Sequence, residues 1–96
     1  SSNLEAGLPT RFALEQNYPN PFNPVTVIRY QLPVKSNVTF KIYDLLGQEV
    51  ATLVNEIQDA GYKSVKWNAA NISSGMYFYR LHAGDFVQTR KLVIIK

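Results

Sequence analysis

Short stretches in which apolar and polar residues alternate account for most of this chain. Along residues 25–32, for example, Ile28, Tyr30 and Leu32 share one face of an extended chain, and more polar residues occupy the other. The same period of two runs through residues 38–43, 62–68 and 76–82. A period of two is typical of β-strands with one buried face, so each stretch is expected to be a strand.

The chain ends on an almost uniformly apolar run. Residues 86–95 predict a last strand, which closes with Leu92, Val93, Ile94 and Ile95. A strand that is apolar on both sides is buried on both faces or covered by a partner. This segment is therefore expected to be a core strand or a contact site.

Residues 48–54 fit two patterns, because Val50, Leu53 and Val54 also have helical spacing. A strand is favoured, since seven residues are short for a helix. The preceding residues predict a hairpin: Asp44 suits the first position of a type I turn, and Gly47 suits the left-handed position that closes a bulged turn.

The N-terminal part of the chain is expected to hold a linker, a short edge strand and an ordered arch. Residues 1–11 are small and polar and predict a linker, and residues 12–96 predict one domain. Residues 12–16 predict the edge strand. Residues 17–24 contain three prolines, which exclude a helix and interrupt sheet pairing. Tyr18 and Phe22 are expected to anchor this arch to the core.

These elements predict an all-β fold, an immunoglobulin-like β-sandwich of about seven antiparallel strands. Its 96 residues, of which 46% are hydrophobic, suffice for one core and exclude a disordered chain. The net charge of +3 is too small for a dedicated nucleic-acid binder. No apolar run is long enough to predict a transmembrane helix. The first residues are not a signal peptide, so the chain is expected to be part of a larger protein.

Catalytic and metal-binding chemistry is not expected. The chain has no cysteine, which excludes disulfides and thiolate sites. His82 is the only histidine, and it falls in an alternating strand, where a solvent-facing role is expected. The acidic residues fall mostly in predicted turns and show no calcium-loop spacing. We therefore expect no enzyme activity, no metal and no cofactor.

Basic and aromatic residues fall on the outward faces of several predicted strands and form a possible contact stripe. Such residues usually keep a sheet soluble or protect its edges, but they can also anchor a protein partner or stack on sugar rings. The sequence leaves these readings open. The stripe consists of Arg29, Lys41, Tyr43, Tyr62, Lys66 and Arg80, with Phe78 among them.

Four segments, in order, carry a resemblance to a known family. Residues 17–30, 41–50, 74–81 and 90–96 read NYPNPFNPVTVIRY, KIYDLLGQEV, SGMYFYRL and RKLVIIK. Together they resemble the type IX secretion system (Por) C-terminal sorting domain, over residues 12–96. The chain is similar also to the immunoglobulin-like domain of the flagellar hook-capping protein, but its proline-rich opening and lysine-bearing end favour the sorting family.

The resemblance implies a non-catalytic module that is covalently part of a larger cargo protein and is read by outer-membrane secretion machinery. The cargo would reach the cell surface or the medium through the periplasm and outer membrane. The terminal strand is a plausible handle for strand addition by a receptor. An alternative is a carbohydrate-binding or cell-attachment module of a secreted polysaccharide hydrolase, with a cell-surface polysaccharide as partner. The residues expected to serve sorting or partner recognition are Asn20, Pro21, Gly47, Gly75, Tyr77, Lys91 and Lys96.

Overall fold

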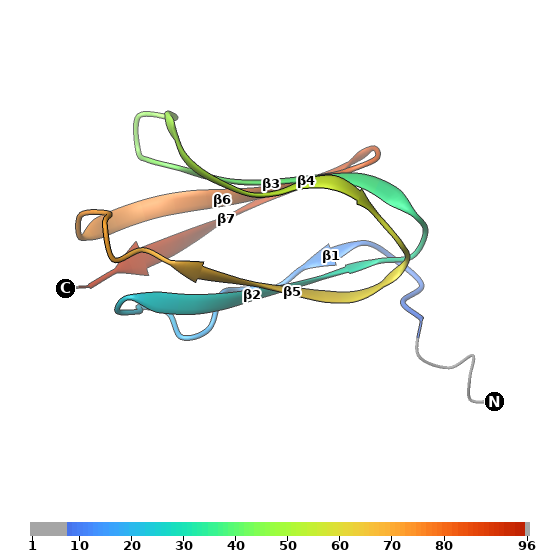
Figure 1. Cartoon of the computed structure of the whole chain (residues 1–96), viewed down its shortest axis with the longest axis horizontal. Helices are drawn as coiled ribbons and strands as arrows, with labels where there is room; N and C mark the ends of the chain where they lie inside the picture. Colours follow the sequence, from blue (N-terminus) through green and yellow to red (C-terminus); the bar gives the residue numbers. More distant parts are fainter. Residues whose placement is uncertain (1–7, 96) are drawn as a thin grey trace.

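A computed structural model describes residues 8–95 of the chain. Seven β-strands make up the described fold (Figure 1). Their bounds are Ala13–Leu14 (β1), Val25–Leu32 (β2), Ser36–Tyr43 (β3), Glu49–Gln58 (β4), Gly61–Asn68 (β5), Gly75–Ala83 (β6) and Phe86–Ile94 (β7). The part of the chain that the structure describes contains no helix.

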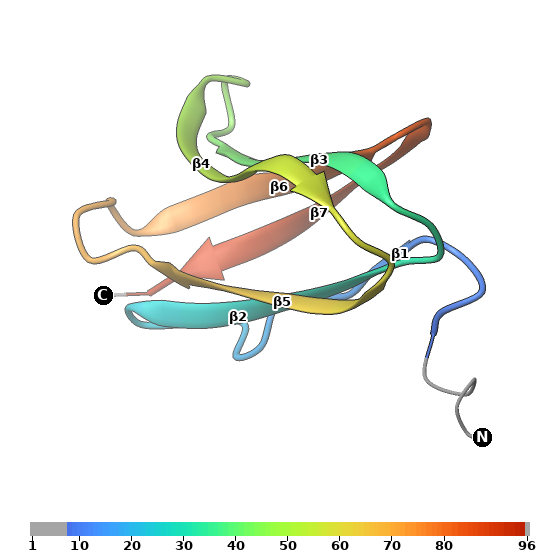
Figure 2. The same cartoon turned by 45° about the vertical axis from the view of Figure 1, so that its right-hand side comes forward.

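The strands form two sheets that face one another, as the sequence predicts for a β-sandwich (Figures 1 and 2). The smaller sheet has the order β1-β2-β5, and the larger has the order β4-β3-β6-β7. All paired strands are antiparallel. The chain passes from one sheet to the other between β2 and β3, between β4 and β5, and between β5 and β6.

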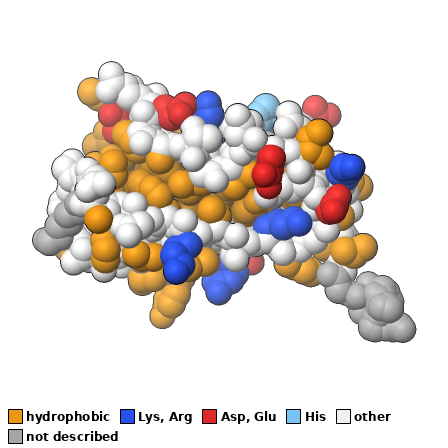
Figure 3. Space-filling view, viewed as in Figure 1, with side chains coloured by type: hydrophobic (Ala, Val, Ile, Leu, Met, Phe, Trp, Pro, Cys, Tyr) orange, Lys and Arg blue, Asp and Glu red, His pale blue; other side chains and the backbone are white. Residues whose placement is uncertain are grey.

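The core lies between the sheets and consists of the residues that alternation placed inward. Their apolar side chains leave water together, and that burial is the main driving force for the fold. On the side where β4 and β5 lie, apolar side chains remain visible between the sheets (Figure 3). The buried set includes Ile28, Tyr30, Leu32, Val38, Phe40, Ile42, Trp67, Tyr77, Tyr79, Leu81, Leu92 and Ile94.

The ambiguous segment after the hairpin is a strand, as favoured from its length. β4 is longer than predicted, because it continues through Asn55–Gln58 and pairs there with the start of β3. Those four residues are polar apart from Ile57, which points outward and is 65% exposed. An edge strand with one solvated side lacks the apolar pattern that would reveal its full length.

The N-terminal predictions are confirmed only in part. The edge strand is shorter than expected and contains Ala13 and Leu14 alone, since Gln16 turns toward the other sheet and donates to the Lys91 carbonyl at 2.7 Å. Of the expected linker, residues 1–7 lie outside the described residues. Pro9 is buried, and the Arg11 carbonyl accepts a hydrogen bond from Gln31 Nε2 at 2.9 Å.

Only one of the two expected arch anchors enters the core. Phe22 is 2% exposed and its ring centroid lies 5.9 Å from that of Trp67. The expectation for Tyr18 is wrong, since its side chain is 74% exposed. The Tyr18 backbone instead exchanges two hydrogen bonds with Val27, both 2.9 Å, and this pairing turns the ring away from the core.

Candidate partner-recognition surface

The hairpin between β3 and β4 is built by one aspartate and one glycine. Asp44 Oδ1 accepts hydrogen bonds from the backbone N–H groups of Leu46 and Gln48, each at 2.9 Å. Gly47 has a φ of +83°, which side chains with a Cβ rarely adopt. These two residues hold the tip in shape, and the residues that the tip presents to solvent are Leu45 and Leu46, 62% and 84% exposed.

Gly75 and Tyr77 shape the start of β6. Gly75 has a φ of +148°, in the region that favours glycine. Tyr77 is only 7% exposed, and its hydroxyl donates to the Ser73 carbonyl at 2.8 Å. Both residues therefore fix the path of the chain from the 69–74 loop into the sheet, and neither presents a side chain to a partner.

The arch, residues 17–24, runs along the outer edge of the end of β7. Asn20 Oδ1 accepts a hydrogen bond from the Val93 N–H at 3.0 Å. The Phe22 N–H donates to the Val93 carbonyl at 3.1 Å, and the Ile95 N–H donates to the Phe22 carbonyl at 2.9 Å. Residues about 70 positions apart in the sequence thus form one small parallel junction.

This junction changes the expectation that a receptor adds a strand to the terminal segment. The outward backbone groups of Val93 and the Ile95 N–H already have partners in the arch. A new strand at this position would have to displace Asn20 and Phe22. With the arch in place, the end of β7 can be read through its side chains and not through its backbone.

A buried polar cluster holds the arch, and the sequence pattern did not reveal it. Asn17, 2% exposed, donates from Nδ2 to Thr26 Oγ1 at 3.0 Å and to the Pro19 carbonyl at 3.1 Å. Thr26 Oγ1 donates to the same Pro19 carbonyl at 2.9 Å. Tyr79 accepts from the Asn17 N–H and donates to the Glu15 carbonyl.

The Tyr79 hydroxyl at the centre of this cluster is held neutral. Its side chain is fully buried, and burial disfavours the charged phenolate. The pKa of Tyr79 is therefore raised to about 12, although the hydrogen bond from Asn17 and the charge of Arg90 act in the opposite direction. The only local signal for this cluster was its polar residues among prolines, because the partners come from three separate segments.

The four segments that carry the family resemblance meet at one end of the sandwich, the motif end. The 44–47 hairpin, the 69–74 loop and the C-terminal end of β7 lie there together, with the arch beside them (Figures 1 and 2). Gly75 pairs with Ile94 across β6 and β7. A hollow of about 310 Å³ separates the hairpin tip from residues 73–77.

Of the two terminal lysines, Lys91 lies within the described residues. Lys91 is exposed on β7 and lies opposite Phe78 of β6. Lys96 lies outside the described residues. Asn20 and Pro21 are both exposed in the arch.

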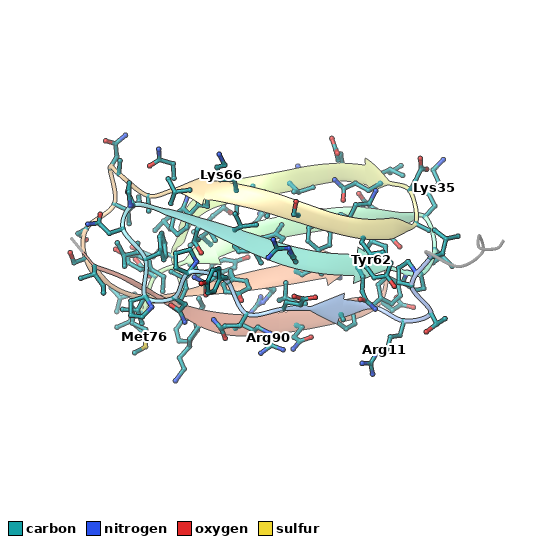
Figure 4. All side chains as sticks on the ribbon, turned by 90° about the horizontal axis from the view of Figure 1, so that it is seen from below. Arg11, Lys35, Tyr62, Lys66, Met76 and Arg90 are labelled. Atoms are coloured by element: carbon teal, nitrogen blue, oxygen red, sulfur yellow. The ribbon has the colours of Figure 1, made fainter. Side chains whose placement is uncertain are left out.

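The structure divides the predicted contact stripe between the two outer faces. Arg29, Tyr62 and Lys66 are exposed on the β2-β5 sheet, where Figure 4 shows Tyr62 and Lys66 on β5. The other members, Lys41, Tyr43 and Arg80 with Phe78, lie on the outer face of the β3-β6-β7 sheet. Alternation showed that these residues point outward, but it could not show that they belong to opposite sheets. They do not form one stripe.

The stripe residues on the larger sheet include one ion pair and one cation–π contact. Lys41 Nζ lies 3.0 Å from Glu49 Oε1. A hydrogen bond from Thr52, together with Lys41, lowers the pKa of the Glu49 carboxyl, and the hydrogen bond to Glu49 raises the pKa of Lys41. The Arg80 guanidinium lies 5.3 Å from the centroid of the Tyr43 ring, within cation–π range.

No cluster of metal ligands is found among residues 8–95, since no group of three or more His, Asp and Glu side chains is placed to hold a metal ion in that part of the chain. His82 is exposed on β6, as expected. No helix in the same range is long and apolar enough to cross a membrane.

Comparison with known proteins agrees with the resemblance in the sequence. A family model described as the secretion system C-terminal sorting domain matches residues 16–96. This range begins at the edge of the arch and includes all four of the segments that meet at the motif end. No curated protein matches the chain. The match spans most of the sequence, and the chain therefore belongs to the family of secretion system C-terminal sorting domains.

Proposed function

We propose that this domain directs a larger cargo protein through the outer-membrane type IX translocon to the cell surface or the medium. Domains of its family mark proteins that are secreted or attached to the cell surface, and they are non-catalytic targeting modules. The observation that supports the proposal best is the motif end, where four segments distant in sequence form one continuous surface. A signal read by a machine needs such a display surface and not an active site.

In this proposal, some of the residues that were predicted to serve sorting or partner recognition shape the motif end, and others contact the partner. Asn20, Gly47, Gly75 and Tyr77 set the backbone of the motif end through a junction hydrogen bond, two left-handed glycines and a buried hydroxyl. Lys91 presents charge to the partner, and Lys96 is proposed to do the same. The domain boundary near Phe12 and the role of Pro21 remain predictions from the sequence.

The test is export of a fluorescent reporter fused to the whole chain, in a bacterium with a working type IX system. The intact fusion is expected in the medium or at the cell surface. Its Lys91→Ala/Lys96→Ala variant is expected to accumulate in the periplasm. Arg29→Ala/Lys66→Ala is the matched control, because it removes the same charge from the opposite sheet.

Two results would count against the proposal. Retention of the folded wild-type fusion in the periplasm would show that the domain does not suffice as a signal. Equal export of both double variants would show that the terminal lysines are not read.

A further inference from the structure

Three open hollows adjoin one another along β6 and β7 at the motif end. The largest has a volume of about 580 Å³, and the others have volumes of about 310 and 190 Å³. Met76 lines the first two, and Phe78 lines the first and the third. The hollows are therefore parts of one surface, which we call the docking face, with Leu45, Met76, Phe78, Arg80 and Lys91 as its defining residues.

The centre of the docking face is apolar. Leu45 is 62% exposed at the hairpin tip, and Met76 is 41% exposed near the start of β6, where its side chain projects away from the ribbon (Figure 4). Phe78 is half-buried and lies opposite Lys91 of β7. When a partner covers exposed apolar side chains that line a hollow, their removal from water stabilises the complex.

The rim of the docking face is cationic. Lys41 and Glu49 form the ion pair found among residues 8–95. Asp44 is the acidic residue that lines two of the hollows, and its Oδ1 already accepts hydrogen bonds from the Leu46 and Gln48 N–H groups. Arg80 donates from Nε to Thr89 Oγ1 at 3.1 Å and stacks on Tyr43, but no carboxylate balances its charge within the described chain. Lys91 is exposed and likewise has no ion-pair partner there.

Side chains on β6 point alternately inward and outward, which explains why the docking face contains no tyrosine of β6. Tyr77 and Tyr79 point into the core and stabilise the fold. Their neighbours Met76, Phe78 and Arg80 must then point outward, beside Val93, Lys91 and Thr89 of β7. The inward residues fix the position of the surface, and the outward residues supply its chemistry.

We propose that the docking face binds an extended segment of a secretion-machinery protein in which apolar side chains alternate with carboxylates. The apolar side chains would fill the hollows around Met76 and Phe78, and the carboxylates would pair with Arg80 and Lys91. This inference rests on the proposed function and names the partner's chemistry.

A peptide fits this surface better than a glycan does. A sugar platform needs an open aromatic ring, but the Arg80 guanidinium already covers the Tyr43 ring. Two of the three central side chains, Leu45 and Met76, are aliphatic and suit an apolar side chain instead. Charge complementarity with Arg80 and Lys91 would set the orientation of the segment.

The cellular test compares matched pairs of variants in the reporter fusion. Arg80→Glu/Lys91→Glu is expected to lower export by about tenfold or more, and Leu45→Ser/Met76→Ser by a similar factor, since central anchors dominate binding. Arg29→Glu/Lys66→Glu makes the same charge change on the other sheet. Ile57→Ser/Val87→Ser removes two apolar side chains, 65% and 53% exposed, from the end of the larger sheet opposite the docking face, where they pair with Asn37 and His82. Both control variants are expected to export like the wild type.

A titration in solution tests the surface independently of secretion. The ¹⁵N-labelled chain is titrated with an acidic peptide that alternates Glu and Leu, with a basic peptide that alternates Lys and Leu, and with polygalacturonate. The acidic peptide is expected to shift the amide resonances of residues 76–80 and 89–93. It should bind the Arg80→Glu/Lys91→Glu variant about tenfold more weakly than the wild type.

The outcomes separate this inference from the proposed function. If the wild-type fusion is not exported, the proposed function fails and the titration alone decides on the docking face. Equal export of the docking-face and control variants, or acidic-peptide shifts confined to β2 and β5, would overturn the docking face. Binding of polygalacturonate but not of the acidic peptide would replace the peptide by an anionic glycan and would also overturn it.

Discussion

Replacing Asn17 by alanine should destabilise the domain strongly, although the residue lies in a loop. Its side chain is almost fully buried and takes part in three hydrogen bonds, to Pro19, Thr26 and Gln16. Each such bond contributes roughly 0.5–1.5 kcal/mol, so their loss should lower the free energy of unfolding by about 3 kcal/mol. For a domain of this size that corresponds to a fall in Tm on the order of 10–20 °C.

The assay is guanidinium and thermal unfolding followed by tryptophan fluorescence. Trp67 is the only tryptophan and packs against Phe22 of the arch, so its emission reports the contact in question. Asn23→Ala is the matched control: Asn23 is exposed in the same arch and makes no hydrogen bond within the described chain. A difference between the two variants of less than about 1 kcal/mol would refute the reasoning.

Phe22→Ala should lower the free energy of unfolding by about 3–5 kcal/mol, because it opens a cavity beside Trp67; a loss in guanidinium unfolding below about 1 kcal/mol would contradict the packing. Gly47→Ala should cost about 1 kcal/mol for its positive φ, whereas an unchanged Tm would argue against the hairpin geometry. The pKa of Tyr79 is raised to about 12 in the folded domain, against an ordinary value near 10. The neutral hydroxyl therefore contributes fully to the free energy of unfolding below pH 10, and this contribution falls by up to about 3 kcal/mol as the pH rises toward 12. Unfolding at several pH values should show this alkaline loss in the wild type, and the same loss in Tyr79→Phe would contradict the assignment.

Local patterns in the sequence were sufficient to identify the strands, but not the short extent of β1 or the full length of β4. The alternation around Ile28, Phe40 and Tyr79 identifies β2, β3 and β6 because each has one buried face, and the burial of these residues confirms it. The hairpin was predictable because Asp44 and Gly47 act within four residues of one another. Strands and tight turns were predictable because they depend on residues only a few positions apart.

Long-range relations were not predictable in the same way. The bond from Val93 to Asn20 joins residues 73 positions apart, and the bond from Asn17 to Tyr79 spans 62 positions. Alternation assigns an outward face but no sheet, so the predicted stripe mixed Lys66 and Arg80, which lie on opposite sheets. Tyr18 was misjudged because its backbone pairing, and not its hydrophobicity, decides where its ring points.

The most direct test of the central claim compares export of the reporter fusion in two strains that differ only in the type IX translocon. We predict that the fusion to the whole chain leaves the cell when the translocon is present. It should remain folded in the periplasm when the translocon is absent. Export in both strains, or in neither, would contradict the claim that this domain is a type IX sorting signal.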